Sequence, residues 1–169
     1  MGTGQDVDAR FTAFVSDSGD RLLRAAYGLT GAWSEAEDLT QDALTELYRH
    51  WKRLESPEAA YSYAKVTMVR MWVRRVRRRR EVLWDVADFA DAEPSGEERS
   101  NVQADVDARV DFLGLLRTLS AGQRAVLVLR YYLDCSVEDA AEQLGCTEGT
   151  VKSQSYKALR SLRILLEEA

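Results

Sequence analysis

A run of cationic side chains at residues 65–80 has the composition of a nucleic-acid contact. Eight of its sixteen residues are Lys or Arg and none is acidic, while Met68 and Trp72 lie within it and Tyr61 and Tyr63 just before it. Aromatic rings can stack on unpaired bases while cations follow the phosphate backbone, which is how single strands are held. A solvated charged face, or a helix whose aromatic residues belong to the core, would have the same composition.

A second candidate contact lies near the C-terminus, where two helical segments flank a tight turn. Residues 136–144 have a compact inner face of small and apolar side chains, Gly145 supplies the turn, and residues 147–163 follow. This second segment is expected to leave Glu148, Thr150, Lys152, Ser153, Tyr156, Lys157 and Arg160 outward. Such side chains near a helix N-terminus can read base edges in a major groove while Lys and Arg contact phosphates. An amphipathic hairpin with a solvated face is the alternative.

The sequence offers little for catalysis or metal binding. His50 is the one histidine, and the two cysteines, Cys135 and Cys146, lie eleven residues apart. Structural zinc generally takes four Cys or His ligands, and an enzyme needs a cluster of acid, base or metal ligands. We therefore expect no catalytic residue, metal, cofactor or small-molecule substrate. The cysteines are expected to be semi-buried thiols in a reducing cell, with a redox switch as the lesser alternative.

The elements that position these residues are expected to be helices. The chain has 2 Pro and 10 Gly and is rich in Ala, Leu, Arg and Glu, which favours helix over strand. Ser34 and Glu37 form a capping-box pattern, and Ser56 precedes Pro57 at the start of the helix with the basic run. The other expected N-caps are Ser120, Ser136 and Thr147. The helix after Ser34 would carry one apolar stripe of Leu39, Ala43, Leu44, Leu47 and Trp51.

Charge is segregated along the chain. The net charge is −5, but residues 81–111 contain ten acidic residues against two arginines, directly after the basic run. Such segregation, more than the net charge, indicates the partners. We therefore predict an all-α protein with two small helical bundles, residues 1–84 and 105–169, joined by an acidic flexible linker at residues 85–104. One or two helices are expected before Gly31.

The sequence shows no sign of a membrane location. No run of about 18 apolar residues is present, and the first ten residues lack the basic-then-apolar order of a secretion signal. We therefore expect a cytoplasmic protein without a membrane partner.

Two segments resemble the bacterial sigma factors of the extracytoplasmic-function type. AEDLTQDALTELYRHW, at residues 36–51, is similar to their polymerase-binding helix, and residues 119–163 are similar to their C-terminal promoter-binding domain. The similarity covers about residues 10–80 and 110–165 in the right order, and is closest to an actinobacterial, SigE-like subgroup. It implies sigma domain 2 and a helix-turn-helix sigma domain 4. The implied function is promoter-specific initiation by RNA polymerase, without catalysis.

The resemblance also implies contact residues and partners. Core RNA polymerase would bind through its clamp helices and flap, with Asp38, Leu39, Gln41, Asp42 and Glu46 in the polymerase-binding helix. The unpaired −10 element of the promoter would meet Tyr63, Lys65, Arg70, Trp72, Arg74, Arg75, Arg77 and Arg78. The duplex −35 element would meet Thr147, Glu148, Thr150, Lys152, Ser153, Tyr156, Lys157 and Arg160. An anti-sigma factor is left open as a further partner.

Some positions depart from the family pattern. Arg70 stands where relatives of the subgroup usually have Asn, and Arg75 and Val76 replace an aromatic pair, so we expect a changed −10 contact. Gln154 stands where many wider relatives have Arg, so the −35 preference is also expected to differ. The alternative interpretation is a helix-turn-helix regulator without a sigma role. It would explain residues 110–165 but neither the acidic-faced helix nor the basic run.

Overall fold

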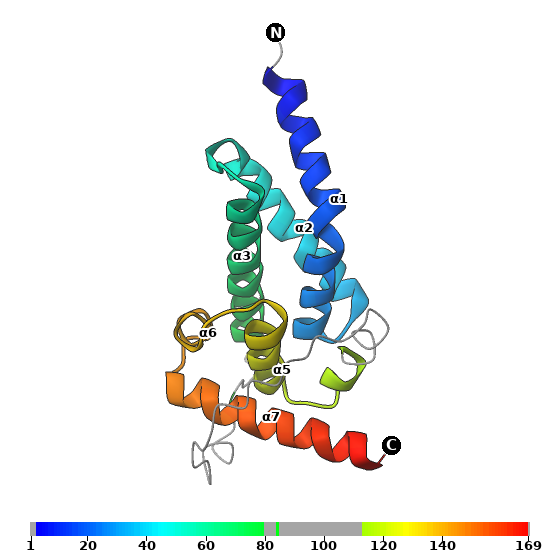
Figure 1. Cartoon of the computed structure of the whole chain (residues 1–169), viewed down its shortest axis with the longest axis vertical. Coiled ribbons are helices and arrows are strands. Elements are labelled where there is room, and N and C mark those ends of the chain that lie inside the picture. Colours follow the sequence, from blue (N-terminus) through cyan, green and yellow to red (C-terminus); the bar gives the residue numbers. More distant parts are fainter. Residues whose placement is uncertain (1–2, 80–83, 85–112, 169) are drawn as a thin grey trace. The chain divides into compact units, whose positions relative to one another are not determined.

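The computed structural model describes residues 3–79, 84 and 113–168, and within them it contains helices and turns but no strand (Figure 1). The elements are α1 (Thr3–Thr30), α2 (Trp33–His50), the 3-10 turn η1 (Trp51–Arg53), α3 (Pro57–Arg78), α5 (Ala121–Leu127), the π-helical η3 (Val128–Tyr132), α6 (Val137–Leu144) and α7 (Glu148–Glu168). The predicted all-α class is confirmed. The predicted acidic linker at residues 85–104 lies outside the described residues.

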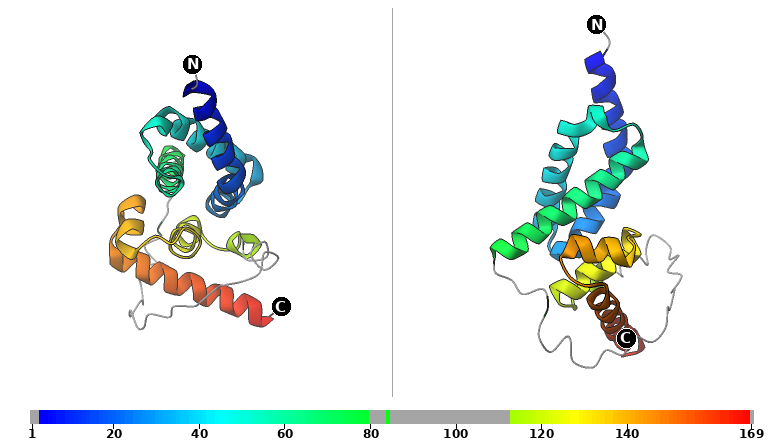
Figure 2. Two further views of the ribbon diagram at one scale, coloured as in Figure 1. Left: turned by 45° about the horizontal axis from the view of Figure 1, so that its top comes forward. Right: turned by 90° about the vertical axis from the view of Figure 1, so that its left-hand side faces the viewer.

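The chain divides into two compact units, Met1–Arg75 and Val76–Ala169. In the first, α1 and α2 form an antiparallel pair and α3 runs back along them (Figures 1 and 2). This arrangement is a helical bundle. The sequence predicted one or two helices before Gly31, and the structure has one, α1.

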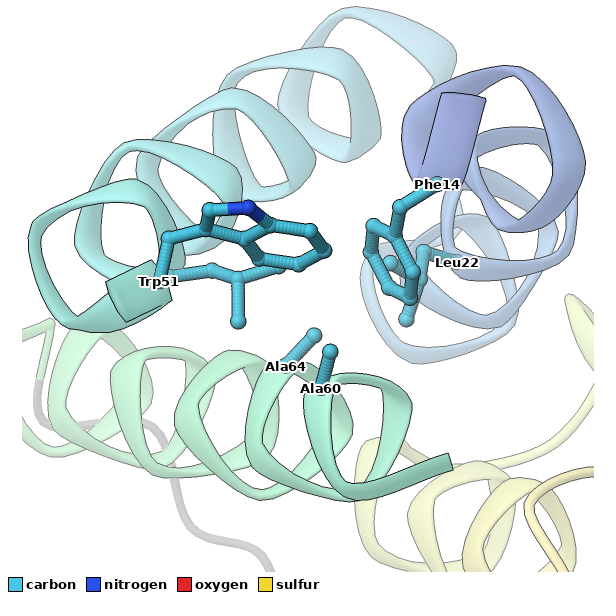
Figure 3. Close-up of a cluster of buried hydrophobic side chains, with 6 residues drawn as sticks. Phe14, Leu22, Trp51, Ala60 and Ala64 are labelled. Carbon is cyan, nitrogen blue, oxygen red and sulfur yellow. The ribbon is translucent and has the colours of Figure 1, made fainter. Parts of the chain in front are cut away.

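Small and aromatic side chains interlock at the core of the first unit. Phe14 and Trp51 lie with their ring centroids 5.4 Å apart, and they meet above the methyl groups of Ala60 and Ala64 (Figure 3). Because these alanines lie four residues apart, they leave one face of α3 flat enough for the indole to approach. The core therefore fixes α3 against α1 and the end of α2.

Most helices begin at the residues that the sequence predicts. The Ser56 Oγ accepts a hydrogen bond from the Ala59 N–H at 3.1 Å, as an N-cap side chain should. Ser120, Ser136 and Thr147 act in the same way, accepting from the N–H groups of Gln123, Asp139 and Thr150. These four predicted N-caps are confirmed.

The predicted capping box of Ser34 and Glu37 is wrong. Helix α2 begins two residues earlier than predicted, at Trp33, and its N-cap is Ala32, whose extended backbone carries no capping side chain. The turn is held instead by Thr30, whose Oγ1 accepts from the Ala32 N–H at 3.4 Å and donates to the Ala32 carbonyl at 3.1 Å. The cause is the position of the turn, which leaves Ser34 already inside the first helical turn.

The second unit contains the predicted helix-turn-helix. Helix α6 ends at Gly145, whose φ of +66° is readily adopted only by glycine, and the Cys146 N–H donates back to the Ala141 carbonyl at 3.0 Å. Helix α7 begins three residues later and packs on α5 and α6. The buried residues of α6 and α7 include Ala140, Ala141, Leu144, Val151, Ala158 and Leu162.

No helix among the described residues is both long and apolar enough to cross a membrane.

Candidate nucleic-acid interface

One face of α2 is polar and exposed. Asp38, Gln41 and Asp42 lie on it at three- and four-residue spacing, which places them one helical turn apart. Glu46 lies one turn further on but is partly buried, because its carboxylate is 3.0 Å from the Arg49 guanidinium and 3.4 Å from His50 Nδ1. The exposed part of this face is therefore Asp38, Gln41 and Asp42, and we call these three residues the α2 face.

Leu39 does not belong to this surface. Its side chain is fully buried, together with Ala36, Ala43 and Leu47 on the inner side of α2. This burial agrees with the predicted apolar stripe of α2, and a polymerase contact of Leu39 stays a prediction, since a partner could reach the side chain only by opening the bundle. Leu39 supports the α2 face from inside.

The last turns of α3 present a row of arginines to solvent. Arg70, Arg74, Arg77 and Arg78 are exposed, while Lys65 is partly buried. Arg75 is also partly buried, since its Nη2 lies 2.6 Å from Asp42 Oδ2 in an ion pair that joins α3 to α2. We call the four exposed arginines the α3 face.

The aromatic residues near the basic run do not share this exposure. Trp72 is only 4% exposed, because it continues at four-residue spacing the buried row of Ala64 and Met68. This burial agrees with the alternative that the aromatic residues of this helix belong to the core, and stacking of Trp72 on a base stays a prediction.

Tyr63 is half-buried and is held by a residue that sequence reasoning left without a role. Its hydroxyl lies 3.0 Å from His50 Nδ1, and the two rings are 5.3 Å apart between centroids. His50 Nδ1 also lies 3.0 Å from the Glu46 carbonyl oxygen. The four-residue spacing of Glu46 and His50 was a local signal for part of this network, but nothing local pointed to Tyr63. Tyr63 is therefore part of the α2–α3 contact.

Helix α7 presents a regular stripe of polar side chains. Glu148, Lys152, Tyr156 and Arg160 are exposed and lie four residues apart, and Tyr156 is 50% exposed although it is aromatic. Such spacing places all four along one side of the helix, beginning in its first turn. We call these residues the α7 stripe. Thr147 is exposed at its start, and Ser153 and Lys157 are partly buried at its edge.

Two residues of α7 turn inward. Thr150 is buried, and its hydroxyl lies 2.9 Å from that of Thr147, so its predicted outward contact is wrong. Its role is in the start of the helix, where its N–H is capped by Thr147. Gln154 is fully buried as well. Any effect of Gln154 on a bound DNA must therefore be indirect.

The structure also describes the two cysteines and the side chains that could bind a metal ion. Within the described ranges no group of three or more His, Cys, Asp or Glu could hold a metal ion. Cys135 is buried and Cys146 partly buried, and neither forms a disulfide. Burial raises the pKa of the Cys146 thiol, which lowers its thiolate fraction near neutral pH.

Comparison with known proteins places the two units in one family. The model for Sigma-70 region 2 matches residues 14–82, and the model for region 4 of Sigma-70 matches residues 109–162. The RNA polymerase sigma-E factor of Streptomyces coelicolor is 33% identical over 155 residues, which are 90% of this chain and 84% of that protein. The ECF RNA polymerase sigma factor SigL of Mycobacterium tuberculosis is 33% identical over 150 residues, covering 87% of this chain and 83% of its own. The chain belongs to the ECF sigma factors.

A solved structure agrees with this assignment. The chain matches the co-crystal structure of the sigma factor RpoE with the anti-sigma factor NepR from Bartonella quintana, with a TM-score of 0.58 and 26% sequence identity. The match covers 92% of this chain and 97% of the chain in that structure. The regulator without a sigma role is thereby set aside, because the region 2 match accounts for the part of the chain that this alternative left unexplained.

The candidate surfaces of this sigma factor fall in different regions. The α2 and α3 faces lie within the region 2 match, and the α7 stripe lies within the region 4 match. As an RNA polymerase sigma factor, the protein acts in transcription initiation with core polymerase and promoter DNA.

Proposed function

We propose that this sigma factor selects promoters with three separate surfaces. The α2 face binds the clamp helices of core polymerase, the α3 face binds the unpaired −10 strand, and the α7 stripe reads the duplex −35 element. The protein positions polymerase and catalyses no reaction itself, and it acts in the cytoplasm. The observation that carries the proposal is the α7 stripe, whose four exposed side chains lie in register along one side of the second helix of a helix-turn-helix.

The chemistry of the α7 stripe fits duplex DNA. Glu148 lies in the first turn of α7, where its carboxylate can accept a hydrogen bond from a cytosine amino group in the major groove. Lys152 and Arg160 can bind phosphates or the acceptor edge of guanine. Tyr156 lies between them and adds an exposed ring with one hydroxyl. Base-reading groups therefore lie toward the N-terminal end, as the docking geometry of recognition helices requires.

The α3 face fits an unpaired strand. Its arginines follow one another along the last turns of α3, and each planar guanidinium can bind phosphate or stack on a base. With Trp72 buried and Tyr63 tied to His50, these arginines, and not the aromatic rings, provide the exposed contact groups.

The α2 face fits a basic partner. Two carboxylates and an amide lie exposed on one side of α2, with Leu39 and Leu47 buried beneath them. A rigid acidic face of this kind complements a positively charged helix. An anti-sigma factor for this chain stays a prediction, supported by the similar RpoE structure that contains NepR.

A promoter library tests the division of labour between α3 and α7. Templates randomised across the −10 and −35 elements would be transcribed by core polymerase with wild type, with Glu148→Ala or with Arg70→Asn. We expect Glu148→Ala to change the preferred bases at −35 only, and Arg70→Asn to change those at −10 only. The exposed Arg117, which lies outside α7, supplies the control variant Arg117→Ala. The assignment would be refuted if Glu148→Ala changed the preferred bases at −10, if Arg70→Asn changed those at −35, or if neither variant changed any preference.

A further inference from the structure

We propose that Asp42 is a positioning residue for promoter binding as well as a polymerase contact, because it holds Arg75 away from DNA until polymerase is bound. The proposal rests on the function proposed above, which places Asp42 on the polymerase surface and the α3 face at the −10 strand, and it adds Arg75, a −10 contact that the sequence resemblance implies. The two residues are 33 positions apart in the chain, yet they share one ion pair.

The geometry makes Asp42 and a DNA phosphate compete for the charge of Arg75. Arg75 Nη2 donates to Asp42 Oδ2 at 2.6 Å, a short charge-assisted hydrogen bond. A DNA phosphate can still reach the other N–H groups of this guanidinium, but only beside a carboxylate that already neutralises its charge. The carboxylate also repels the phosphate as a like charge. In the chain alone, Arg75 is therefore a weaker DNA contact than its exposed neighbour Arg74.

Polymerase would release Arg75 by binding the carboxylate of Asp42. The side chain of Asp42 is 62% exposed, so a basic helix can reach it from solvent, whereas that of Arg75 is 28% exposed. When a cation of that helix engages the Asp42 carboxylate, the pull on Arg75 weakens and its negative neighbour is neutralised. One carboxylate thus links the two binding events.

The expected coupling is modest because the pair is partly exposed. Ion pairs of this kind alter equilibria by no more than about fivefold. An ion pair this weak can be broken by a binding partner, and a change in affinity of about fivefold is large enough to measure.

The test is a double-mutant cycle on the full chain without polymerase. Affinity for a single-stranded oligonucleotide bearing the −10 sequence would be measured by fluorescence anisotropy for wild type, Asp42→Asn, Arg75→Gln and the double variant. We expect Asp42→Asn to raise the affinity about two- to fivefold, and to do so only when Arg75 is present. It should also steepen the salt dependence by about 0.7 of a logarithmic unit, since one more phosphate is neutralised on a single strand.

Matched variants separate this coupling from a general charge effect. Asp42→Glu keeps the carboxylate and should restore the low affinity, while Arg74→Gln combined with Asp42→Asn should keep the gain. A gain that persists in the Arg75→Gln background would overturn the inference, as would no gain at all.

The same cycle at saturating core polymerase distinguishes this inference from the proposed function. There we expect Arg75→Gln to weaken −10 binding and Asp42→Asn to give no further gain. If Arg75→Gln weakens binding but the cycle on the free chain shows no coupling, the inference fails and the −10 assignment stands. If Arg75→Gln leaves holoenzyme binding unchanged, Arg75 is not a DNA contact and the inference fails, whereas the α3 face fails only if Arg74→Gln leaves holoenzyme binding unchanged as well.

Discussion

Arg70 lies exposed on α3, at a position where the sequence resemblance implies Asn in sigma factors of this subgroup. A guanidinium has donors only, whereas an amide has both a donor and an acceptor. Arg70→Ala should weaken open-complex formation, and Arg70→Asn should shift the favoured −10 bases toward the family pattern. Permanganate footprinting of the melted strand measures the first effect, and a randomised −10 library the second. The exposed Lys52 supplies the control variant Lys52→Ala. Undiminished melting by Arg70→Ala would eliminate the contact.

Tyr48 gives a pH-dependent prediction for the first unit. Its hydroxyl donates to Asp8 Oδ1 at 2.6 Å, and this hydrogen bond, together with the Asp8 charge, raises the pKa of Tyr48 above its ordinary value. Only the protonated phenol can donate, so the link is fully present below about pH 10 and is lost as the pH rises through the raised pKa. Tyr48→Phe should therefore remove a tyrosine absorbance step whose midpoint lies above the ordinary pKa of tyrosine. If the absorbance step that Tyr48→Phe loses has its midpoint at or below the ordinary pKa of tyrosine, this assignment is contradicted.

Single residues were the hardest level to predict from sequence. The composition of residues 65–80 identified a basic helix, but not that Trp72 faces inward, because both sides of α3 carry apolar side chains. Thr150 was misplaced for a related reason: burial depends on how a helix is rotated against its neighbours. The His50–Tyr63 contact joins two helices, and local spacing carries no signal for it.

At the scale of elements, helix boundaries were largely predictable. An N-cap hydrogen bond joins groups within three residues, so the sequence alone contains its determinants. Ser56, Ser120, Ser136 and Thr147 all behave in this way. The exception, Ser34, arose where Gly31, at a φ of +73°, ends α1 and the turn uses Thr30 in place of a cap.

The orientation of α7 predicts different effects for exposed and buried positions. Lys152→Ala should weaken −35 binding for all sequences and lower the salt slope by about one unit, as expected for a lost phosphate contact. Binding would be measured by titrating a −35 duplex at several salt concentrations. Glu148→Ala is the matched comparison and should change which bases are preferred. An unchanged slope for Lys152→Ala would place that residue outside the interface.

A substitution at the buried Gln154 should change the stability of the fold and not a direct DNA contact. Because it is fully buried, Gln154→Arg must bury a charge or force α7 to shift, and we expect a loss of at least about 1 kcal/mol in the free energy of unfolding. Urea denaturation measures this loss. Lys152→Arg, at an exposed position of the same helix, is the control and should unfold like wild type. An equally stable Gln154→Arg variant would show that this position is more open than the structure indicates.

At the scale of the whole molecule, Asp42 tests the polymerase surface. Asp42→Lys places a like charge before a basic partner helix, which costs several kcal/mol across an interface, so core-polymerase affinity should fall by at least tenfold. The same change breaks the pair with Arg75, but because both side chains are partly exposed the free energy of unfolding should change by no more than about 1 kcal/mol. Competition with wild type for core polymerase measures the first quantity and urea denaturation the second.

The matched control is Asp17→Lys, which makes the same charge change at an exposed position of α1. If Asp17→Lys weakens core binding as much as Asp42→Lys does, the effect is one of net charge and the α2 face is not the contact.

The order of the two regions along the chain could be predicted from sequence, since two separate segments resembled sigma factors at the right separation and both regions are matched. The ion pair between Asp42 and Arg75 could not, because it depends on how α3 lies against α2.

Transcription in a reconstituted system tests the central claim most directly. Core polymerase and this chain would be combined on a pool of templates randomised at both promoter elements, and the initiated transcripts sequenced. We predict specific initiation that requires the chain and selects fixed bases in both elements, with α7 variants altering −35 selection alone. Transcription that does not depend on the chain, or that shows no selection at either element, would contradict the account.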